Sequence, residues 1–234
     1  MEWKIVHIAE TDSTNHWLRE QGGREDMVVW TDYQTAGRGC GTNTWESARG
    51  SNLMFSMLLH PVDVPAKNQF RISMAVAVAV RELLARYADG FTIKWPNDIY
   101  WLDYKICGML IENRVQGSHI KDSIVGIGLN VNQKQFLSDA PNPISLSQII
   151  GHDFDCGRLL HEFLECFDAV CGRTTLRADY EDHLFRLEEQ AEYADGTGRF
   201  LAVLNGVDAD GRLVLTDASG RERRYAFKEV KFMI

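Results

Sequence analysis

Two lysines set into apolar, strand-like sequence are the first sign of chemistry in this chain. Lys94 lies in an alternating apolar and polar run, residues 91–95, which has the period of a half-buried strand. Pro96 has no backbone donor and ends that strand. Lys105 opens a second strand-like run, which we expect to neighbour the first. Because two ammonium groups that converge on one pocket repel each other unless an anion lies between them, the segment predicts a site for a phosphate, a carboxylate or both.

Three smaller residues of the same segment support this prediction. Asn97 and Asp98 lie between the two runs, and Gly108 lies in the middle of the second. Glycine normally destabilises a strand, so Gly108 predicts a close approach by a ligand or another backbone. The competing interpretation is that Lys94 and Lys105 are solvated surface lysines, as most lysines are. Their apolar setting weakens that interpretation.

A glycine-rich loop precedes this segment in the chain. It reads Gln34-Thr35-Ala36-Gly37-Arg38-Gly39, too rich in glycine for regular structure. Its glycines let backbone N–H groups approach an anion, and Arg38 adds a planar fork of donors. Its spacing is neither that of a Walker loop nor that of a dinucleotide fingerprint, and most loops of this kind are simple turns. Trp45 follows the loop closely in the sequence. Two interpretations of it have equal weight: its ring stacks on a base, or it anchors the loop.

Two other polar segments are suited to a site. Ser13, Thr14 and Asn15 precede a predicted helix, and taken alone they favour a plain N-cap. In the run 125–132 the residues Gly126, Gly128, Asn130 and Asn132 share one face of a strand. A face without side chains at two successive positions leaves room for a flat ligand, whereas a bulge or tight packing against a helix is the alternative. Asparagine is depleted in strands, so Asn130 on that bare face favours the pocket.

The predicted elements around these segments form an α+β fold. A helix begins after Asn15, a long one runs from Pro65 to about Tyr87, and helical spacing continues from Arg158 to Glu189 with a break near Gly172. The predicted strands are 5–8, 27–33, 53–59, 91–95, 105–113 and 123–132. From residue 198 the pattern changes to short strands with hairpin signals at Asn205-Gly206, Asp210-Gly211 and Ser219-Gly220. These signals predict a small β module that packs on the main domain.

Composition excludes several classes of protein. The five cysteines show no Cys-x-x-Cys spacing, which argues against a disulfide framework and a structural zinc site. The net charge of −8 argues against general nucleic-acid binding. The longest apolar run, 72–80, is too short to span a bilayer, and residues 1–10 lack a signal-peptide core. We expect a cytoplasmic protein that does not bind membranes.

Taken together, in this order and spacing, the segments resemble the biotin–protein ligase family. The resemblance covers roughly residues 6–132 well, weakens through the helical stretch, and recovers at 204–207 and 211–213. The combination is specific although each part alone is not. The matching segments are Ser13-Thr14-Asn15, Gln34 to Gly39 with Trp45 behind it, Lys94-Trp95-Pro96-Asn97-Asp98, Lys105-Ile106-Cys107-Gly108 and Gly126 to Asn132.

The resemblance implies a mixed β-sheet catalytic domain of the biotin/lipoate ligase type over residues 1–188 and a small SH3-like β-barrel over 189–234. It implies biotin–[acetyl-CoA-carboxylase] ligase activity with ATP, Mg²⁺ and biotin, and no metal-ligating side chain. Biotin's carboxylate attacks the α-phosphate of ATP, giving biotinyl-AMP and pyrophosphate. A lysine of a biotin carboxyl carrier protein then takes the biotinyl group. The chain is expected to be a monomer or a homodimer.

The resemblance also implies roles for the site residues. Arg38, Lys94 and Lys105 neutralise the charge that develops on phosphate, and Lys105 contacts the reacting carboxylate. We add the hypothesis that Asp98 helps to deprotonate the carrier lysine. The residues expected to bind biotin are Ser13, Thr14, Asn15, Gln34, Gly37, Arg38, Lys105, Gly108, Gly126 and Gly128, with Ser13, Thr14 and Gln34 on the ureido ring. Those expected to bind ATP are Arg38, Gly39, Trp45, Lys94, Asn97 and Asn130.

The chain departs from the family pattern at two points. Cys40 stands where the family commonly has a second Arg, or Gln, after Gly-Arg-Gly. A thiol cannot replace a guanidinium fork on a phosphate, so we predict a more mobile loop that retains biotinyl-AMP less tightly. The pattern also begins within the first fifteen residues, so we expect no N-terminal winged-helix domain and no repressor function.

Two other functions compete with this one. A lipoate or octanoate ligase shares the fold, but the Ser-Thr-Asn and Lys-Trp-Pro-Asn-Asp segments favour biotin, because a ureido ring needs several short polar partners. A non-catalytic biotin- or nucleotide-binding module would not need the three cations Arg38, Lys94 and Lys105.

Overall fold

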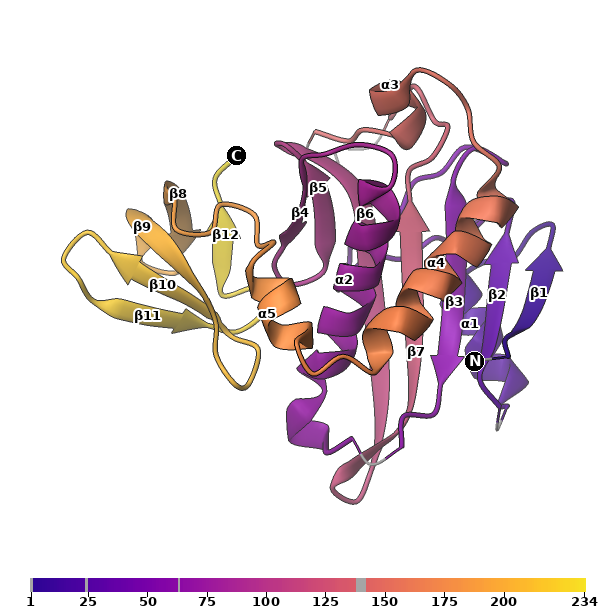
Figure 1. The fold of residues 1–234 in the computed structure, drawn as a ribbon, viewed down its shortest axis with the longest axis horizontal. Coiled ribbons are helices and arrows are strands. Elements are labelled where there is room, and N and C mark those ends of the chain that lie inside the picture. The colour runs from indigo at the N-terminus through magenta and orange to yellow at the C-terminus, as the bar shows by residue number, and fades with distance from the viewer. Residues whose placement is uncertain (1, 24, 63, 138–141) are drawn as a thin grey trace.

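The computed structural model describes residues 2–23, 25–62, 64–137 and 142–234, whose strands form two sheets (Figure 1). The strands of the larger sheet are β1 (Lys4–Ile8), β2 (Met27–Thr31), β3 (Leu53–Leu59), β4 (Phe91–Lys94), β5 (Asp98–Trp101), β6 (Tyr104–Gln116) and β7 (His119–Leu129). Over the described residues this sheet has seven strands in the order β1-β2-β3-β7-β6-β5-β4. β1 is parallel to β2, whereas the other neighbours pair antiparallel, so the expected mixed sheet is confirmed.

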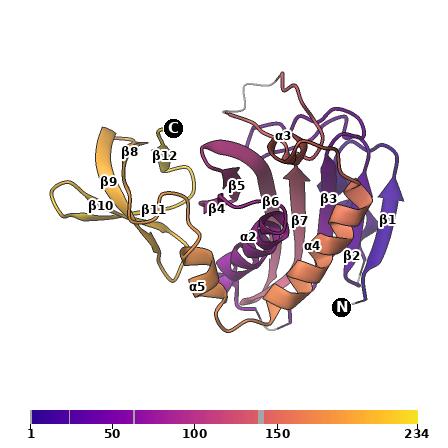
Figure 2. The ribbon, with the colours of Figure 1, turned by 45° about the horizontal axis from the view of Figure 1, so that its top comes forward.

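Helices cover both faces of the larger sheet. In Figures 1 and 2, α2 (Phe70–Ala85) and α4 (Cys156–Cys171) lie across one face of the sheet. Figure 1 shows α1 (Thr14–Gln21) behind the other face. Phe55 and Met57 of β3 join the large core under α2 and α4, and Leu58 packs with Leu18 of α1 in a second cluster. This difference follows from the two-residue period of a strand. The even positions of β3 therefore face the side on which α1 lies.

Shorter helical segments connect these elements. They are the 3₁₀ turn Ala66–Asn68, α3 (Leu146–Ile150) and α5 (Leu176–Glu181). Ser145 and Gln148 form a capping box at the start of α3, with the Ser145 N–H donating to Gln148 Oε1 at 3.0 Å. None of the helices in the described ranges is long and apolar enough to cross a membrane.

The second sheet is formed by the C-terminal residues and packs on the main domain, as predicted. Its strands are β8 (Gln190–Asp195), β9 (Gly198–Val207), β10 (Leu213–Asp217), β11 (Glu222–Tyr225) and β12 (Val230–Phe232). They pair in the order β11-β10-β9-β8-β12, so within the described residues β11 and β12 are edges and the pairing does not close a barrel. Tyr193 and Leu215 belong to the same core as Phe55, which joins the two sheets.

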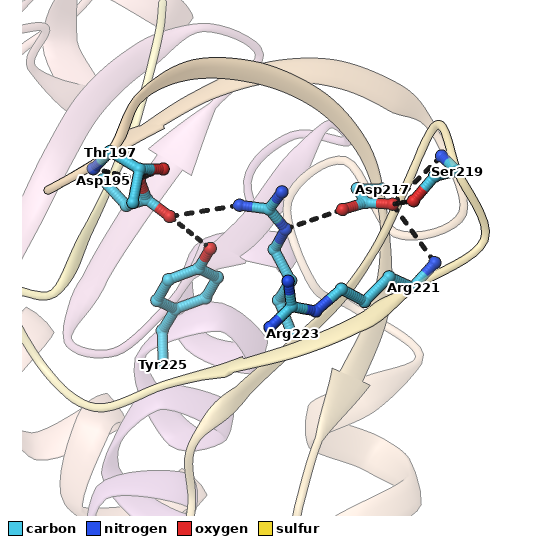
Figure 3. A network of polar contacts seen from close by, with 7 residues as sticks. All are labelled: Asp195, Thr197, Asp217, Ser219, Arg221, Arg223 and Tyr225. Carbon is cyan, nitrogen blue, oxygen red and sulfur yellow. Dashed lines mark hydrogen bonds and ion pairs between the residues drawn. The ribbon is translucent and has the colours of Figure 1, made fainter.

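A polar network fixes the outer turns of this C-terminal sheet (Figure 3). Arg223 lies between Asp217, at 2.8 Å, and Asp195, at 3.3 Å, and Tyr225 donates to Asp195 at 2.7 Å. The Thr197 hydroxyl donates to Asp195 and the Ser219 hydroxyl to Asp217, each at 2.6 Å. These bonds hold the pKa of Asp195 at about 2 and lower that of Asp217.

Three sequence-based expectations need correction. Asn205-Gly206 lies inside β9 rather than in a turn, next to the register shift between Val214 and Leu215 of β10. β5 was not predicted, because the first strand was expected to end at Pro96 and the next to begin only at about Lys105. As a consequence, Lys94 and Lys105 are not on neighbouring strands, since β5 separates β4 from β6.

Candidate active site

The chemically suited segments meet at a cavity of about 1140 Å³. Pockets for small ligands are commonly about 300–1,000 Å³, so this one has room for a large ligand or for two. Of the predicted site residues, the cavity is lined by Ser13, Thr14, Asn15, Gln34, Arg38, Gly39, Trp45, Lys94, Asn97, Asp98, Lys105, Gly108, Gly126, Gly128 and Asn130. Gly37 is not in this lining.

One end of the cavity carries a preassembled group of short polar side chains. Gln34 Oε1 accepts from the backbone N–H of Thr14 at 2.8 Å and from its hydroxyl at 3.1 Å. Ser56 Oγ lies 2.6 Å from both Thr14 Oγ1 and Asn15 Oδ1. Gln34 Nε2 faces only the weak acceptor Met54 Sδ, at 3.6 Å, among the described atoms. This end can therefore offer donors to a ligand carbonyl.

The structure argues against the interpretation of Ser13 as a plain N-cap. Ser13 is the N-cap residue of α1 by position, yet its side chain makes no capping bond. Ser13, Thr14 and Asn15 are all buried and line the cavity. Ser56 was missed by sequence reasoning because it lies inside the apolar strand β3, and its place on the face toward α1 lets it support Thr14 and Asn15 from behind the cavity lining.

The glycines of β6 and β7 allow close approach, as predicted, but the protein's own side chains make that approach. A Cβ on Gly128 would lie 2.3 Å from Trp45 Cε2, and one on Gly108 would lie 2.9 Å from Trp45 Cζ3. A Cβ on Gly126 would lie 2.2 Å from Asn15 Oδ1. The face is therefore covered by an indole and an amide, which corrects the expectation of a bare floor.

Trp45 anchors the glycine-rich loop. Its backbone N–H donates to Gly37 O at 3.0 Å, and a Cβ on Gly37 would lie 2.5 Å from Trp45 O. The indole Nε1 is buried and has no hydrogen-bond partner among the described residues. Of the two interpretations of Trp45, the structure favours anchoring. The unpartnered Nε1 also remains able to donate to a ligand.

The other end of the cavity concentrates charge. Lys105 Nζ lies 2.7 Å from Asp98 Oδ1, and both side chains are largely buried. Lys94 Nζ lies 4.9 Å from the ring centre of Phe232 and 5.1 Å from that of Tyr100. Burial lowers the pKa of Lys94, and the charge of Asp98 opposes that shift. Asp98 is therefore the protein's own anion between the two lysines.

The glycine-rich loop lies beside this charged end of the cavity. Asn97 Nδ2 donates to Met109 O at 2.6 Å and lies 2.9 Å from Cys40 Sγ. Burial, followed by the charge of Asp98, raises the pKa of the Cys40 thiol. Arg38 is exposed at the cavity and makes no ion pair with any described residue. A guanidinium without an acidic partner at a cavity is suited to an incoming anion.

Asn130 and Asn132, which follow β7, form hydrogen bonds mainly with backbone atoms. Asn130 Nδ2 donates to Ile144 O at 3.1 Å, while its backbone N–H bonds Ile106 O at 2.9 Å. Asn132 exchanges two hydrogen bonds with the backbone of Phe154, at 2.8 and 2.9 Å, and is not in the cavity lining. Asn130 lines the cavity and at the same time holds the loop that follows it.

The C-terminal sheet supplies part of the site that sequence reasoning missed. Phe227, Lys228, Val230, Lys231 and Phe232 line the cavity. No local pattern marks them, because they reach the site only when the C-terminal sheet packs on the main domain, where Phe232 of β12 meets Lys94 of β4. Trp95 strengthens this junction, since its Nε1 donates to Gly211 O at 2.9 Å.

Comparisons with known proteins agree with this geometry. A family model described as the biotin/lipoate A/B protein ligase family matches residues 7–130. The bifunctional ligase/repressor BirA of Bacillus subtilis is 30% identical over 231 residues, which cover 94% of this chain and 70% of the relative. A biotin–[acetyl-CoA-carboxylase] ligase of Paracoccus denitrificans is 27% identical, covering 92% of this chain and 95% of the relative. The structure of a biotin protein ligase from Aquifex aeolicus in complex with biotin and ATP superposes with a TM-score of 0.82 and 25% identity, covering 98% of this chain and 99% of the other.

Proposed function

The chain belongs to the biotin/lipoate A/B protein ligase family and is a biotin protein ligase, and we propose which of its side chains carry out each step. It activates biotin with ATP and transfers the biotinyl group to a protein. The observation that carries our assignment is that one cavity has a polar end around Gln34 and a charged end around Lys105. Biotin has matching ends, a neutral ureido ring and a carboxylate.

Biotin lies with its ureido ring at the polar end of the cavity. Gln34 Nε2 and the hydroxyl of Ser13 offer donors to the ureido oxygen, Thr14 orients Gln34 through the two bonds to its amide oxygen, and Ser56 holds Thr14 and Asn15 in place. Trp45, packed on Gly108 and Gly128, forms the apolar wall for the thiophane ring. The carboxylate then reaches Lys105.

The first step joins the carboxylate to the nucleotide. A carboxylate oxygen of biotin forms a bond to the α-phosphorus of ATP, and the bond from that phosphorus to the bridging oxygen of pyrophosphate breaks. Lys105 positions the carboxylate, and Arg38 and Lys94 stabilise the negative charge that grows on the phosphate. Asn97 and Gly39 line the same end of the cavity and shape it, since their N–H groups bond Met109 O and Asn43 O. No side chain is needed as a nucleophile.

Mg²⁺ is proposed as a companion of ATP rather than as a ligand of protein carboxylates. Within the described ranges no group of three or more His, Cys, Asp or Glu side chains is placed to hold a metal ion. Asp98, the acid at the charged end, already pairs with Lys105. The donor set therefore does not fit a protein-held metal, and Mg²⁺ would be held by the phosphates of the nucleotide.

The second step transfers the biotinyl group to a lysine of a biotin carboxyl carrier protein. The lysine amine attacks the acyl carbon, AMP leaves, and the amine loses a proton. We assign that proton to Asp98, the carboxylate at the charged end. Residues 1–188 act as the catalytic domain and 189–234 as a separate module that completes the cavity wall.

A pyrophosphate assay tests the function. The purified chain is mixed with ATP and either biotin or lipoate, and pyrophosphate release is followed. We expect release with biotin, and labelling of a carrier domain but not of its lysine-to-arginine variant. Release with lipoate alone would show a lipoate ligase, and release with neither would show a binding module.

A single-turnover experiment tests the role of Asp98. Asp98→Asn is loaded with preformed biotinyl-AMP and mixed with the carrier domain. Loss of a general base lowers a rate by about 10² to 10⁴. We expect a transfer rate that falls in this range and loses its dependence on pH, with pyrophosphate formation much less affected. Equal losses in both steps would mean that Asp98 acts only by holding Lys105.

A further inference from the structure

A lysine of the C-terminal sheet reaches the glycine-rich loop of the main domain. Lys228 lies between β11 and β12 with a φ of 68°. Side chains with a Cβ are disfavoured in this left-handed region, which glycine adopts freely. A lysine is therefore held in a conformation where glycine would be more stable. Such a backbone strain is a reason to ask what the side chain does.

The Lys228 ammonium group lies against the backbone of the opposing loop. Gly41 has a φ of 73°, and a Cβ placed on it would lie 2.0 Å from Lys228 Nζ. Any side chain at position 41 would displace this ammonium group. Lys228 Nζ therefore lies against the residue that follows Cys40, and its charge opposes the burial that raises the pKa of the Cys40 thiol.

No described residue neutralises the charge of Lys228. Lys228 is exposed, lines the cavity and forms no ion pair with any residue in the described ranges. Its one ring contact is with the neighbouring Phe227, at 5.7 Å from the ring centre. An ammonium group that faces a cavity without an acidic partner is available to an anionic ligand.

We propose that Lys228 binds the phosphate of biotinyl-AMP, supplying from the C-terminal sheet the cation that Cys40 cannot supply from the loop. The proposal rests on the function proposed above. Lys228 of the C-terminal sheet and Arg38 of the main domain then face the phosphate from two sides. The expectation that Cys40 weakens retention of the intermediate considered the loop alone, and Lys228 compensates for it.

The test measures how fast preformed biotinyl-AMP leaves the full-length protein. Lys228→Met removes the charge and keeps the bulk, and Lys121→Met, an exposed lysine outside the cavity lining, is the matched control. Loss of a charge-assisted hydrogen bond corresponds to about tenfold or more in affinity. We expect release about tenfold faster in Lys228→Met and unchanged in Lys121→Met.

Two further variants separate ligand binding from a structural role. Lys228→Gly removes the charge and relieves the left-handed backbone, so we expect higher stability to urea together with faster release. Cys40→Arg should restore slow release in the Lys228→Met background and have less effect in the wild type. A Lys228→Met protein that releases the intermediate like Lys121→Met, or whose fast release is not slowed by Cys40→Arg, would overturn the inference and leave the proposed function standing. A wild type that forms no biotinyl-AMP would overturn both.

Discussion

The ammonium nitrogen of Lys105 lies 2.7 Å from the Oδ1 atom of Asp98, on adjacent strands of the larger sheet. Asp98 pairs with Gly108 in the ladder, and a Cβ at Gly108 would lie 3.4 Å from both Lys105 Cε and Nζ. This is an ordinary van der Waals distance, so the lysine side chain lies across the face of Gly108 on its way to the carboxylate. The pair aims Lys105 into the cavity before any ligand arrives.

Lys105→Met should abolish most of the first chemical step. A pre-aimed donor of this kind typically contributes a factor of about 10² to 10³ in rate. We expect pyrophosphate formation with biotin to fall by that factor, while Lys121→Met stays at the wild-type rate. A fall of less than threefold would mean that another group positions the carboxylate.

Gly128→Ala should destabilise the fold and disturb the Trp45 wall. The new methyl group would lie 2.3 Å from the indole of the half-buried Trp45, and overpacking of this kind costs about 1–3 kcal/mol. Gly172→Ala is the matched control, because nothing lies within 4 Å of its modified position. Urea unfolding measures the stability of both variants. Equal stabilities would show that the Trp45 loop moves aside freely.

Acid should unfold the C-terminal sheet through Asp195 and Asp217. Their folded pKa values lie below the ordinary value, 3.8, at about 2 for Asp195, so these carboxylates stabilise the fold above pH 4. That stability is lost as the pH falls from about 4 through about 2, because protonation then breaks the bonds. NMR titration of the Asp195 carboxyl should give a pKa of about 2. A value near 4 would contradict the network in Figure 3.

Cys40 should be a slow nucleophile despite its place at the cavity. Burial raises the pKa of its thiol, and only the thiolate reacts with alkylating agents. We expect alkylation of Cys40 by iodoacetamide at pH 8 to be slower than that of a free thiol, since a raised pKa leaves a smaller fraction of thiolate. Mass spectrometry of the Cys40 peptide gives the rate. Modification as fast as that of glutathione would contradict the burial.

Local patterns predicted much of the fold. β3 was predicted with its observed bounds, because a continuous apolar run marks a strand buried on both faces. β5 was missed, since it has only four residues and starts at Asp98, a residue depleted in strands. α3 was missed because its five residues show too little periodicity. Short elements are fixed by the strands beside them, and a single sequence does not display those neighbours.

The site was predictable where glycine and charge stand out from apolar sequence. Arg38, Lys94, Lys105 and Gly128 were found in this way. Ser56 was not, because a lone serine in an apolar strand gives no sign of the face it occupies. Phe232 and Lys228 were also not found, because they are brought to Lys94 and Gly41 by packing between parts far apart in the chain.

Folding must bring the cavity together from remote parts of the chain. β3 can pair with β7 only after a long loop closes, and the wall formed by residues 227–232 is added from the end of the chain. Closing long loops slows folding, and chains fold from the N-terminus as they are synthesised. The cavity is therefore among the last features to form. Capture of biotin would report that the whole protein, and not merely its larger sheet, has reached the native state.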